Sequence, residues 1–249
     1  MNPSSPFMPA GTVYGVLLNF RGELAALAPQ MSEPPYKAAP KAPVLYVKPA
    51  NTWSADGAAV AVPAHVPQVE VGATIAMVMG PPAQTGRSQD AIKSAASYVL
   101  MNDLSIPHAS FFRPPVKYKC LDGFLGVGAR PVPADQAGDP ARFTLQVLIN
   151  GEIRQAVDFA NLARSASQLL ADVSEFMTLR AGDVLMLGCD AGRPLARVGD
   201  RIEIRAPGFE TLTNTLVAEA AMSAAGPSQG AKAPSGGSAV HEVTSVGAP

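Results

Sequence analysis

The segment FTLQVLINGEIRQAV, residues 143–157, decides the fold class of this chain. Apolar and polar side chains partly alternate over residues 143–149, and the Asn150-Gly151 pair that follows is the strongest short-range signal of a β-hairpin. Residues 152–157 are the predicted return strand. We therefore expect the surrounding chain to be built from short strands.

The proline content favours the same class. The chain holds 24 prolines among 249 residues, about twice the average share of roughly 5%. Each proline disrupts a helix interior or a central position in a sheet, so the first half is expected to form short strands and ordered loops. Further strands are predicted at residues 13–18, 44–47, 73–79, 184–187 and 201–205. In the last of these, Ile202 and Ile204 are expected to face inward and their charged neighbours outward.

Two segments have the apolar spacing of helices, residues 88–100 and residues 162–177. Ser88 is a suitable N-cap for the first of them. Strands and helices do not alternate regularly enough for a doubly wound sheet, and no glycine-rich phosphate loop follows a strand. The predicted fold is therefore α+β and rich in strands.

Composition excludes several classes of protein. A formal net charge of −1 and a pI of about 6.3 do not suit a nucleic-acid binder. No apolar run reaches the roughly 18 residues of a membrane helix, the N-terminus lacks a secretory signal, and two cysteines make no disulfide framework. We expect a soluble cytoplasmic protein with one domain over residues 12–221. A flexible arm, residues 1–11, and a disordered Ala/Gly/Ser/Pro-rich tail, residues 222–249, are expected to flank it.

The most informative segment for chemistry is residues 98–124. Asn102-Asp103 ends an apolar run, and Arg113 and Lys119 follow within a loop rich in aromatic residues and prolines. Arginine binds carboxylates bidentately, and a lysine shielded from water can stabilise an enolate. A solvated loop whose lysines lie along apolar surface is the alternative interpretation.

A second candidate region follows the predicted strand at residues 44–47. Lys48 leaves this strand directly before a proline, and Asn51 lies just after it, where strand ends commonly carry functional groups. An exposed loop lysine is the alternative here. The three histidines do not have metal-binding spacing, and Cys120 and Cys189 are expected to be inert thiols.

Four blocks of sequence in this order resemble the fumarylacetoacetate hydrolase family: residues 34–52, 69–80, 98–124 and 174–188. The similarity covers about residues 13–216 and is greatest to the N-terminal half, or separate first subunit, of the bifunctional isomerase/decarboxylases of 4-hydroxyphenylacetate (homoprotocatechuate) degradation. It implies a mixed β-roll with two or three flanking helices. It also implies chemistry on a 2-oxo acid assisted by a divalent ion such as Mg²⁺ or Mn²⁺.

The resemblance carries over only some of the family's functional residues. Asp103 matches the third metal ligand, and Lys119 matches the lysine that faces the oxo acid. Lys48 matches the lysine that ends the Lys-Pro strand. The family's Glu-x-Glu metal ligands fall on Gly72 and Thr74, which supply no carboxylate.

The family's His-x-x-Glu lid pair falls on Glu23 and Ala26. Asp103 is therefore the one matching metal ligand, and a single carboxylate does not hold Mg²⁺ without much help from water or substrate. The expected cofactor state is either no metal or a weakly held Mg²⁺ or Mn²⁺ ion.

The resemblance implies an enzyme that decarboxylates 5-oxopent-3-ene-1,2,5-tricarboxylate and isomerises 2-hydroxyhepta-2,4-diene-1,7-dioate through a dienolate. Lys119 is expected to stabilise the enolate oxygen, and Asp103 or Glu23 to move the proton. The predicted substrate-binding residues are Lys48, Asn51, Asn102 and Arg113. A structural subunit that pairs with a metal-competent paralogue is the main alternative, and a carboxylate-binding module is another. A homodimer or a pairing with a paralogous subunit is expected.

Overall fold

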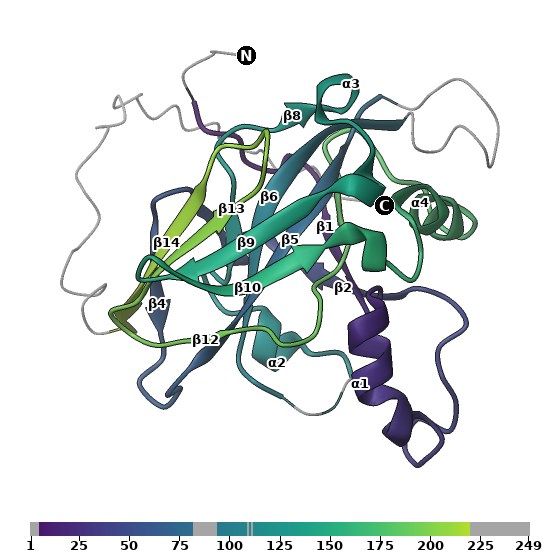
Figure 1. Ribbon diagram of the computed structural model, residues 1–249, viewed down its shortest axis with the longest axis horizontal. Coiled ribbons are helices and arrows are strands. Elements are labelled where there is room, and N and C mark those ends of the chain that lie inside the picture. The colour runs from purple at the N-terminus through teal and green to yellow at the C-terminus, as the bar shows by residue number, and fades with distance from the viewer. Residues whose placement is uncertain (1–4, 82–93, 109, 111, 220–249) are drawn as a thin grey trace, which may run out of the picture.

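The computed structural model describes residues 5–81, 94–108, 110 and 112–219, which form two sheets with helices at their margins (Figure 1). The helices are α1 (Arg21–Met31), α2 (Val116–Lys119), α3 (Ala134–Ala137) and α4 (Ala166–Ser174). Over these ranges no helix is long and apolar enough to cross a membrane.

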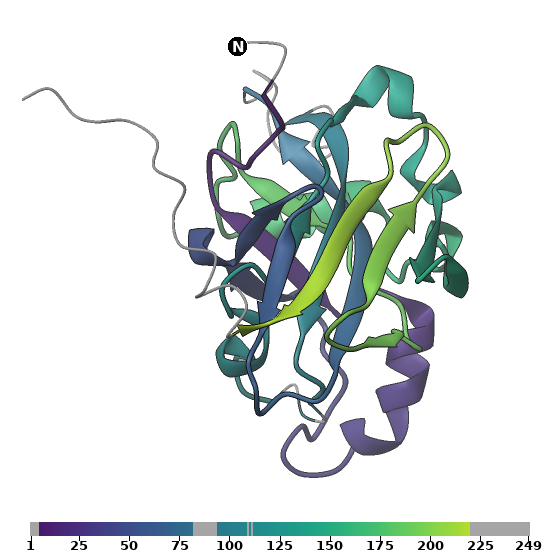
Figure 2. The ribbon, with the colours of Figure 1, turned by 90° about the vertical axis from the view of Figure 1, so that its left-hand side faces the viewer.

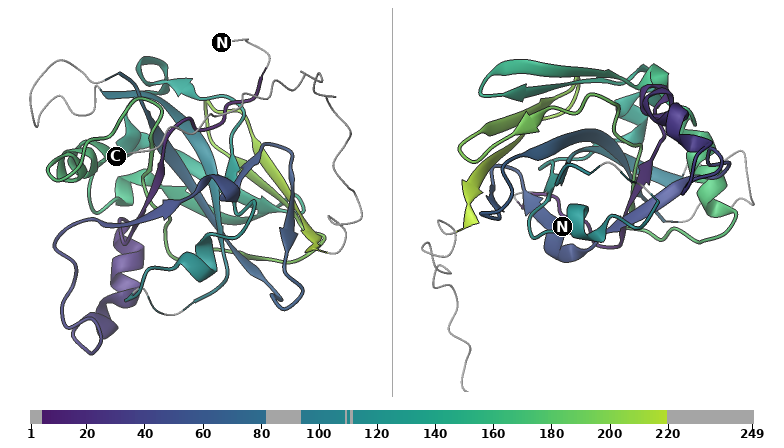
Figure 3. Two further views of the ribbon diagram at one scale, coloured as in Figure 1. Left: turned by 180° about the vertical axis from the view of Figure 1, so that it is seen from behind. Right: turned by 90° about the horizontal axis from the view of Figure 1, so that it is seen from below.

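The larger sheet has the strand order β2-β1-β11-β5-β6-β7-β3, with β12 beside β5 and β8 beside β6. Its strands are β1 (Val13–Leu17), β2 (Val44–Lys48), β3 (Trp53–Ala55), β5 (Val69–Met79), β6 (Ala95–Ser105), β7 (Leu125–Val127), β8 (Val132–Pro133), β11 (Val184–Met186) and β12 (Leu195–Ala196). Seen from below, this sheet curls into a half-barrel (Figure 3). The long antiparallel pair β5 and β6 forms its centre and places Gly72 opposite Asp103.

The smaller sheet has the order β10-β9-β13-β14-β4. Its strands are β4 (Ala59–Val62), β9 (Thr144–Ile149), β10 (Glu152–Asp158), β13 (Arg201–Arg205) and β14 (Leu212–Ala218). Figure 2 shows β14 in yellow-green between β4 and β13. The predicted hairpin is the β9–β10 pair, and Asn150 and Gly151 have φ values of 53° and 83°, as a tight hairpin turn requires.

Two apolar cores lie on opposite faces of the larger sheet. Side chains alternate along β5, so Val71 and Ile75 pack between the two sheets, while Ala76 and Val78 pack on the other face with Tyr46. On that second face, β5 and β6 also carry polar residues. The β-rich α+β prediction is confirmed. We call the second face, which lies inside the curl of the half-barrel and away from the smaller sheet, the inner face, and its polar positions define where a site can form.

The predicted helix over residues 88–100 is wrong where the structure describes it. Residues 95–105 form strand β6, which pairs with β5 along its length. Because β6 has apolar residues facing a core on each side, its buried positions do not alternate, and alanines at helical spacing imitate a helix face. Ser88, the expected N-cap, lies outside the described residues.

The second predicted helix is present but shorter than residues 162–177. Helix α4 spans Ala166–Ser174, and its N-cap residue Ser165 accepts a hydrogen bond from the Gln168 backbone N–H at 3.2 Å.

In β13, Ile202 and Ile204 are buried as expected, but Glu203 is buried as well, between Arg201 and Arg205. Charge neutralisation by these two arginines allows a carboxylate there.

Backbone hydrogen bonds attach the described part of the N-terminal segment to the sheets. The Phe7 N–H donates to the Ala129 carbonyl at 2.8 Å, and the Gly11 N–H donates to Gly182 at 3.0 Å. The domain boundaries after residues 11 and 221 stay predictions. The predicted tail, residues 222–249, lies outside the described residues.

Candidate active site

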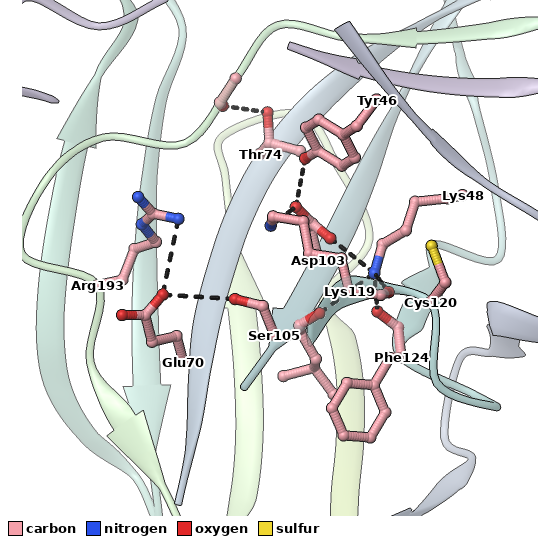
Figure 4. A network of polar contacts seen from close by, with 12 residues as sticks. Tyr46, Lys48, Glu70, Thr74, Asp103, Ser105, Lys119, Cys120, Phe124 and Arg193 are labelled. Carbon is pink, nitrogen blue, oxygen red and sulfur yellow. Dashed lines mark hydrogen bonds and ion pairs between the residues drawn. The ribbon is translucent and has the colours of Figure 1, made fainter. Parts of the chain in front are cut away.

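A carboxylate held by two lysines lies on the inner face of the larger sheet. Asp103 of β6 is fully buried, with Oδ1 2.8 Å from Lys48 Nζ and Oδ2 2.7 Å from Lys119 Nζ (Figure 4). The Tyr46 hydroxyl also donates to Oδ2. Burial by itself would raise the pKa of Asp103, but the charges and hydrogen bonds of Lys119 and Lys48 outweigh it and hold the pKa well below its usual range. Asp103 is therefore an ion throughout the neutral pH range.

Lys48 connects the edge strand β2 to the rest of this group. Its ammonium donates to the backbone carbonyls of Leu104, Lys119 and Phe124 as well as pairing with Asp103. Burial lowers the pKa of Lys48, and Asp103 opposes that shift. The predicted role of Lys48 as an anchor for a substrate carboxylate would require some of these bonds to break, since an ammonium has only three N–H donors.

Lys119 has a different position, because it reaches a cavity. This cavity of about 620 Å³ is lined by Lys119, Tyr46 and Arg113 among mostly apolar side chains of β1, β2 and the segment around α2. Lys119 Nζ also lies 4.8 Å from the centre of the Tyr46 ring. Gly15 leaves the space for this ring, since a Cβ at residue 15 would lie 2.1 Å from a ring carbon. The structure thus brings Lys119 and Arg113 to one cavity.

The inner face does not provide the family's metal site. A Cβ at Gly72 would lie 2.4 Å from the Asp103 carbonyl oxygen and 3.1 Å from Cys189 Sγ, while the Thr74 hydroxyl donates to the Gly188 carbonyl. Both oxygens of Asp103 already face ammonium groups, and burial raises the pKa of the Cys189 thiol to about 12. Among the described residues there is no group of three or more His, Cys, Asp or Glu that could hold a metal ion. The donor set expected for Mg²⁺ or Mn²⁺ does not fit here.

A second charged group, centred on Arg193, lies beside the first. The Glu23 carboxylate of α1 accepts from the Leu18 backbone N–H and from the Arg193 guanidinium, each at 2.6 Å. Arg193 also lies 3.7 Å from Glu70 of β5, whose carboxylate is 3.4 Å from the Ser105 hydroxyl (Figure 4). Burial raises the pKa of Glu23, and the charge of Arg193 opposes this only in part. Glu23 is therefore easier to protonate than an exposed glutamate.

The two predicted asparagines do not join this face. Asn102 points between the two sheets, where its amide donates to Asn214 Oδ1 at 3.2 Å. Asn51 lies on an exposed turn and donates to Asp122 at 2.7 Å. The sequence did not single out Tyr46 or Arg193. Tyr46 shares the face of Lys48 two residues along β2, so strand alternation could have identified it.

Together these features define a class of protein: a β-roll with a buried lysine–aspartate group on the inner face of its larger sheet. The chain belongs to the fumarylacetoacetate hydrolase family, because the family model for the fumarylacetoacetate (FAA) hydrolase C-terminal domain matches residues 12–217.

Sequence relatives narrow the comparison. A 4-hydroxyphenylacetate degradation bifunctional isomerase/decarboxylase from Salmonella dublin is 41% identical over 209 residues, which are 84% of this chain and 48% of that protein. An Escherichia coli protein of the same name is 38% identical over 209 residues, with the same coverage. The chain thus spans about half the length of the curated relatives it matches.

Solved structures share the architecture. The 5-carboxymethyl-2-hydroxymuconate delta-isomerase from Mycobacterium smegmatis has a TM-score of 0.70 at 25% identity, covering 86% of this chain and 82% of that one. Fumarylpyruvate hydrolase from Pseudomonas aeruginosa, solved with Mn²⁺ and pyruvate, has a TM-score of 0.72 at 22% identity, covering 88% and 99%. The second likeness concerns the fold alone.

Proposed function

We propose that this chain is an enzyme of 4-hydroxyphenylacetate breakdown that decarboxylates 5-oxopent-3-ene-1,2,5-tricarboxylate and isomerises 2-hydroxyhepta-2,4-diene-1,7-dioate. The names of the relatives at 38–41% identity support the reaction class. The observation that carries the proposal is the position of Lys119, a buried cation at the wall of a largely apolar cavity. Such a cation is suited to an oxyanion formed during the reaction.

Both reactions pass through one electron-rich intermediate. In the decarboxylation, the carbon–carbon bond to the carboxylate at C2 breaks and CO₂ leaves. The bonding electron pair moves through the C3–C4 double bond to the 5-oxo oxygen, which gives a dienolate. In the isomerisation, the 2-hydroxyl loses its proton and a proton is added at C5, so that the oxo group re-forms. A single group that stabilises the dienolate oxygen therefore serves both steps.

The side chains of this site divide the work. Lys119 stabilises the developing oxyanion, and Asp103 and Tyr46 hold its ammonium in place. Arg113, on the same cavity, binds a carboxylate of the substrate. Asp103 is a weak base because its pKa is held low, so Glu23, whose pKa is raised by burial, is the better group to carry the proton.

Replacement of Lys119 tests this assignment. Lys119→Ala should lower turnover of the tricarboxylate at least about a hundredfold, the usual loss when one oxyanion-stabilising group is removed. Lys117→Ala is the matched control, because Lys117 lies on the same helix but is exposed. Turnover is followed by ultraviolet absorbance, with and without a chelator. Unchanged turnover in Lys119→Ala removes this lysine from the mechanism, and loss of wild-type activity with the chelator contradicts a metal-free site.

A structural subunit is the second candidate function. It is favoured by Gly72 and Thr74, which stand at the family's Glu-x-Glu positions and supply no carboxylate, and by Cys189, whose Sγ would lie 3.1 Å from a Cβ at residue 72. In that case the purified chain has no activity and restores or raises the activity of a metal-competent paralogue when the two are mixed. Turnover by the chain alone excludes this candidate.

A further inference from the structure

Arg193 is a largely covered cation of the candidate site that has no role in the reaction described above. It comes from the segment between β11 and β12, and 11% of its side chain is exposed. Figure 4 shows it beside Glu70, on the side of Asp103 away from Lys48. It therefore adds a second positive position to the inner face, separate from the two lysines.

In the described part of the chain, no carboxylate binds the guanidinium of Arg193 through both of its oxygens. Glu23 offers it one oxygen at 2.6 Å and uses the other for the Leu18 backbone N–H. Glu70 lies 3.7 Å away, which is beyond hydrogen-bond distance. A free carboxylate could bind the planar fork through both oxygens, which is the strongest arrangement available to arginine.

Glu23 connects the Arg193–Glu23 ion pair to the wall of the cavity that Lys119 lines. Its carboxylate holds the N–H of Leu18, and the adjacent Leu17 lines the cavity that Lys119 also lines. The positive charge of Lys119 lowers the pKa of Glu23, so the two groups lie within electrostatic reach of each other. A linear dicarboxylate held by Lys119 in the cavity would therefore have to extend past Leu17 to place its other carboxylate at Arg193.

The charges around Glu23 limit how an anion can enter. Lys48, Lys119 and Arg193 face Asp103, Glu23 and Glu70, so these three cations are already matched by three carboxylates. Asp190 adds a further negative charge near Glu23 and lies against Gly22 of α1. An additional buried carboxylate would be an unpaired charge unless one carboxylate becomes neutral. Glu23 is the candidate, since burial already favours its protonated form.

We propose that Arg193 binds one terminal carboxylate of the substrate, and that Glu23 releases Arg193 and takes up a proton as the ligand enters. The inference rests on the proposed function for its ligand class, a linear dicarboxylate. It makes Arg193 a specificity-determining residue and couples ligand binding to proton uptake.

Calorimetry with heptanedioate, the saturated seven-carbon diacid, tests the proposal on the full chain. Titrations at pH 7 in phosphate and in Tris give the number of protons taken up, because the two buffers have different ionisation enthalpies. The wild type should take up protons on binding. Glu23→Gln should bind at least as tightly without that uptake, and Arg193→Lys should bind ~10–100-fold more weakly through loss of the bidentate contact. Arg154→Gln, which changes an arginine–glutamate pair on β10 whose two side chains are 53% and 70% exposed, should match the wild type.

Several outcomes overturn the subsite. These are equal proton uptake in Glu23→Gln and wild type, equal affinity in Arg193→Lys and wild type, or no binding of heptanedioate to the folded wild type. Circular dichroism confirms folding, and the Glu23→Gln result does not depend on altering Arg193. Turnover separates this proposal from the proposed function. Arg193-dependent binding without turnover upholds the subsite alone, whereas turnover that is unaffected in Arg193→Lys upholds the function alone.

Discussion

Replacing Lys48 by methionine should destabilise the fold more than any surface substitution. Methionine keeps an unbranched side chain but removes an ammonium that lies 2.8 Å from Asp103 and donates to three backbone carbonyls. Breaking a buried ion pair from one side costs about 3–5 kcal/mol. The unpaired carbonyls add to this loss, at about 1 kcal/mol or more each. Because Lys119 and Tyr46 still satisfy part of Asp103, we expect a net loss near the middle of that range, ~4 kcal/mol.

Urea denaturation followed by far-ultraviolet circular dichroism measures this loss. The free energy of unfolding comes from linear extrapolation to zero urea. Lys41→Met is the control, since Lys41 lies in the exposed segment just before β2 and should change stability by less than about 0.5 kcal/mol. The double variant with Asp103→Asn should lose less than the sum of the two single variants, because both act on one pair. A loss under about 1 kcal/mol in Lys48→Met refutes the reasoning.

Three further substitutions test other parts of the structure. The lowered pKa of Asp103 means that its stabilising contribution is present above its unfolded value and disappears as the pH falls towards the folded value. The free energy of unfolding of Asp103→Asn should therefore fall less than that of the wild type as the pH is lowered from about 5 to 3. The same decrease in both proteins, measured by urea denaturation at each pH, would contradict this. Gly72→Glu should cost ~1–3 kcal/mol because its Cβ meets the Asp103 carbonyl; a thermal melt raised by Mn²⁺ would show that a metal site forms after all. Asn150→Ala should cost ~1–2 kcal/mol, since it loses bonds to Asp200 and to the Arg201 N–H and places alanine at positive φ; an unchanged melting temperature would count against that account.

The sequence predicts those elements whose backbone conformation depends on neighbouring residues alone, such as the β9–β10 hairpin turn. The Asn150-Gly151 turn needs positive φ at both residues, and these residue types supply it wherever they stand. The pattern over residues 95–100 favours a helix although they belong to β6, because apolar side chains from distant parts of the chain cover both faces of this strand. Its neighbours β5 and β7 pair with it along its edges. The two-residue strands β8 and β12 are too short to carry any periodic signal.

The site shows the same division between local and long-range information. Asp103 and Lys119 lie 16 positions apart in the most informative segment, and the structure brings them within 2.7 Å. Arg193 lies 170 positions from Glu23, and their contact depends on where the segment after β11 returns beside α1. No spacing within the chain encodes that return. Arg193 therefore became visible only when the folded arrangement was known.

The bonds of Lys48 have a consequence for how this family can change over evolutionary time. Lys48 of the candidate site also connects β2 to β6 and α2, so we expect selection for the fold alone to retain it, with or without turnover. Retention of Lys48 and Asp103 in a homologous sequence is thus a signature of foldability. Arg193 and Glu23 join no strands of the sheets to each other, so under the proposed function we expect their retention to follow activity more closely than that of Lys48.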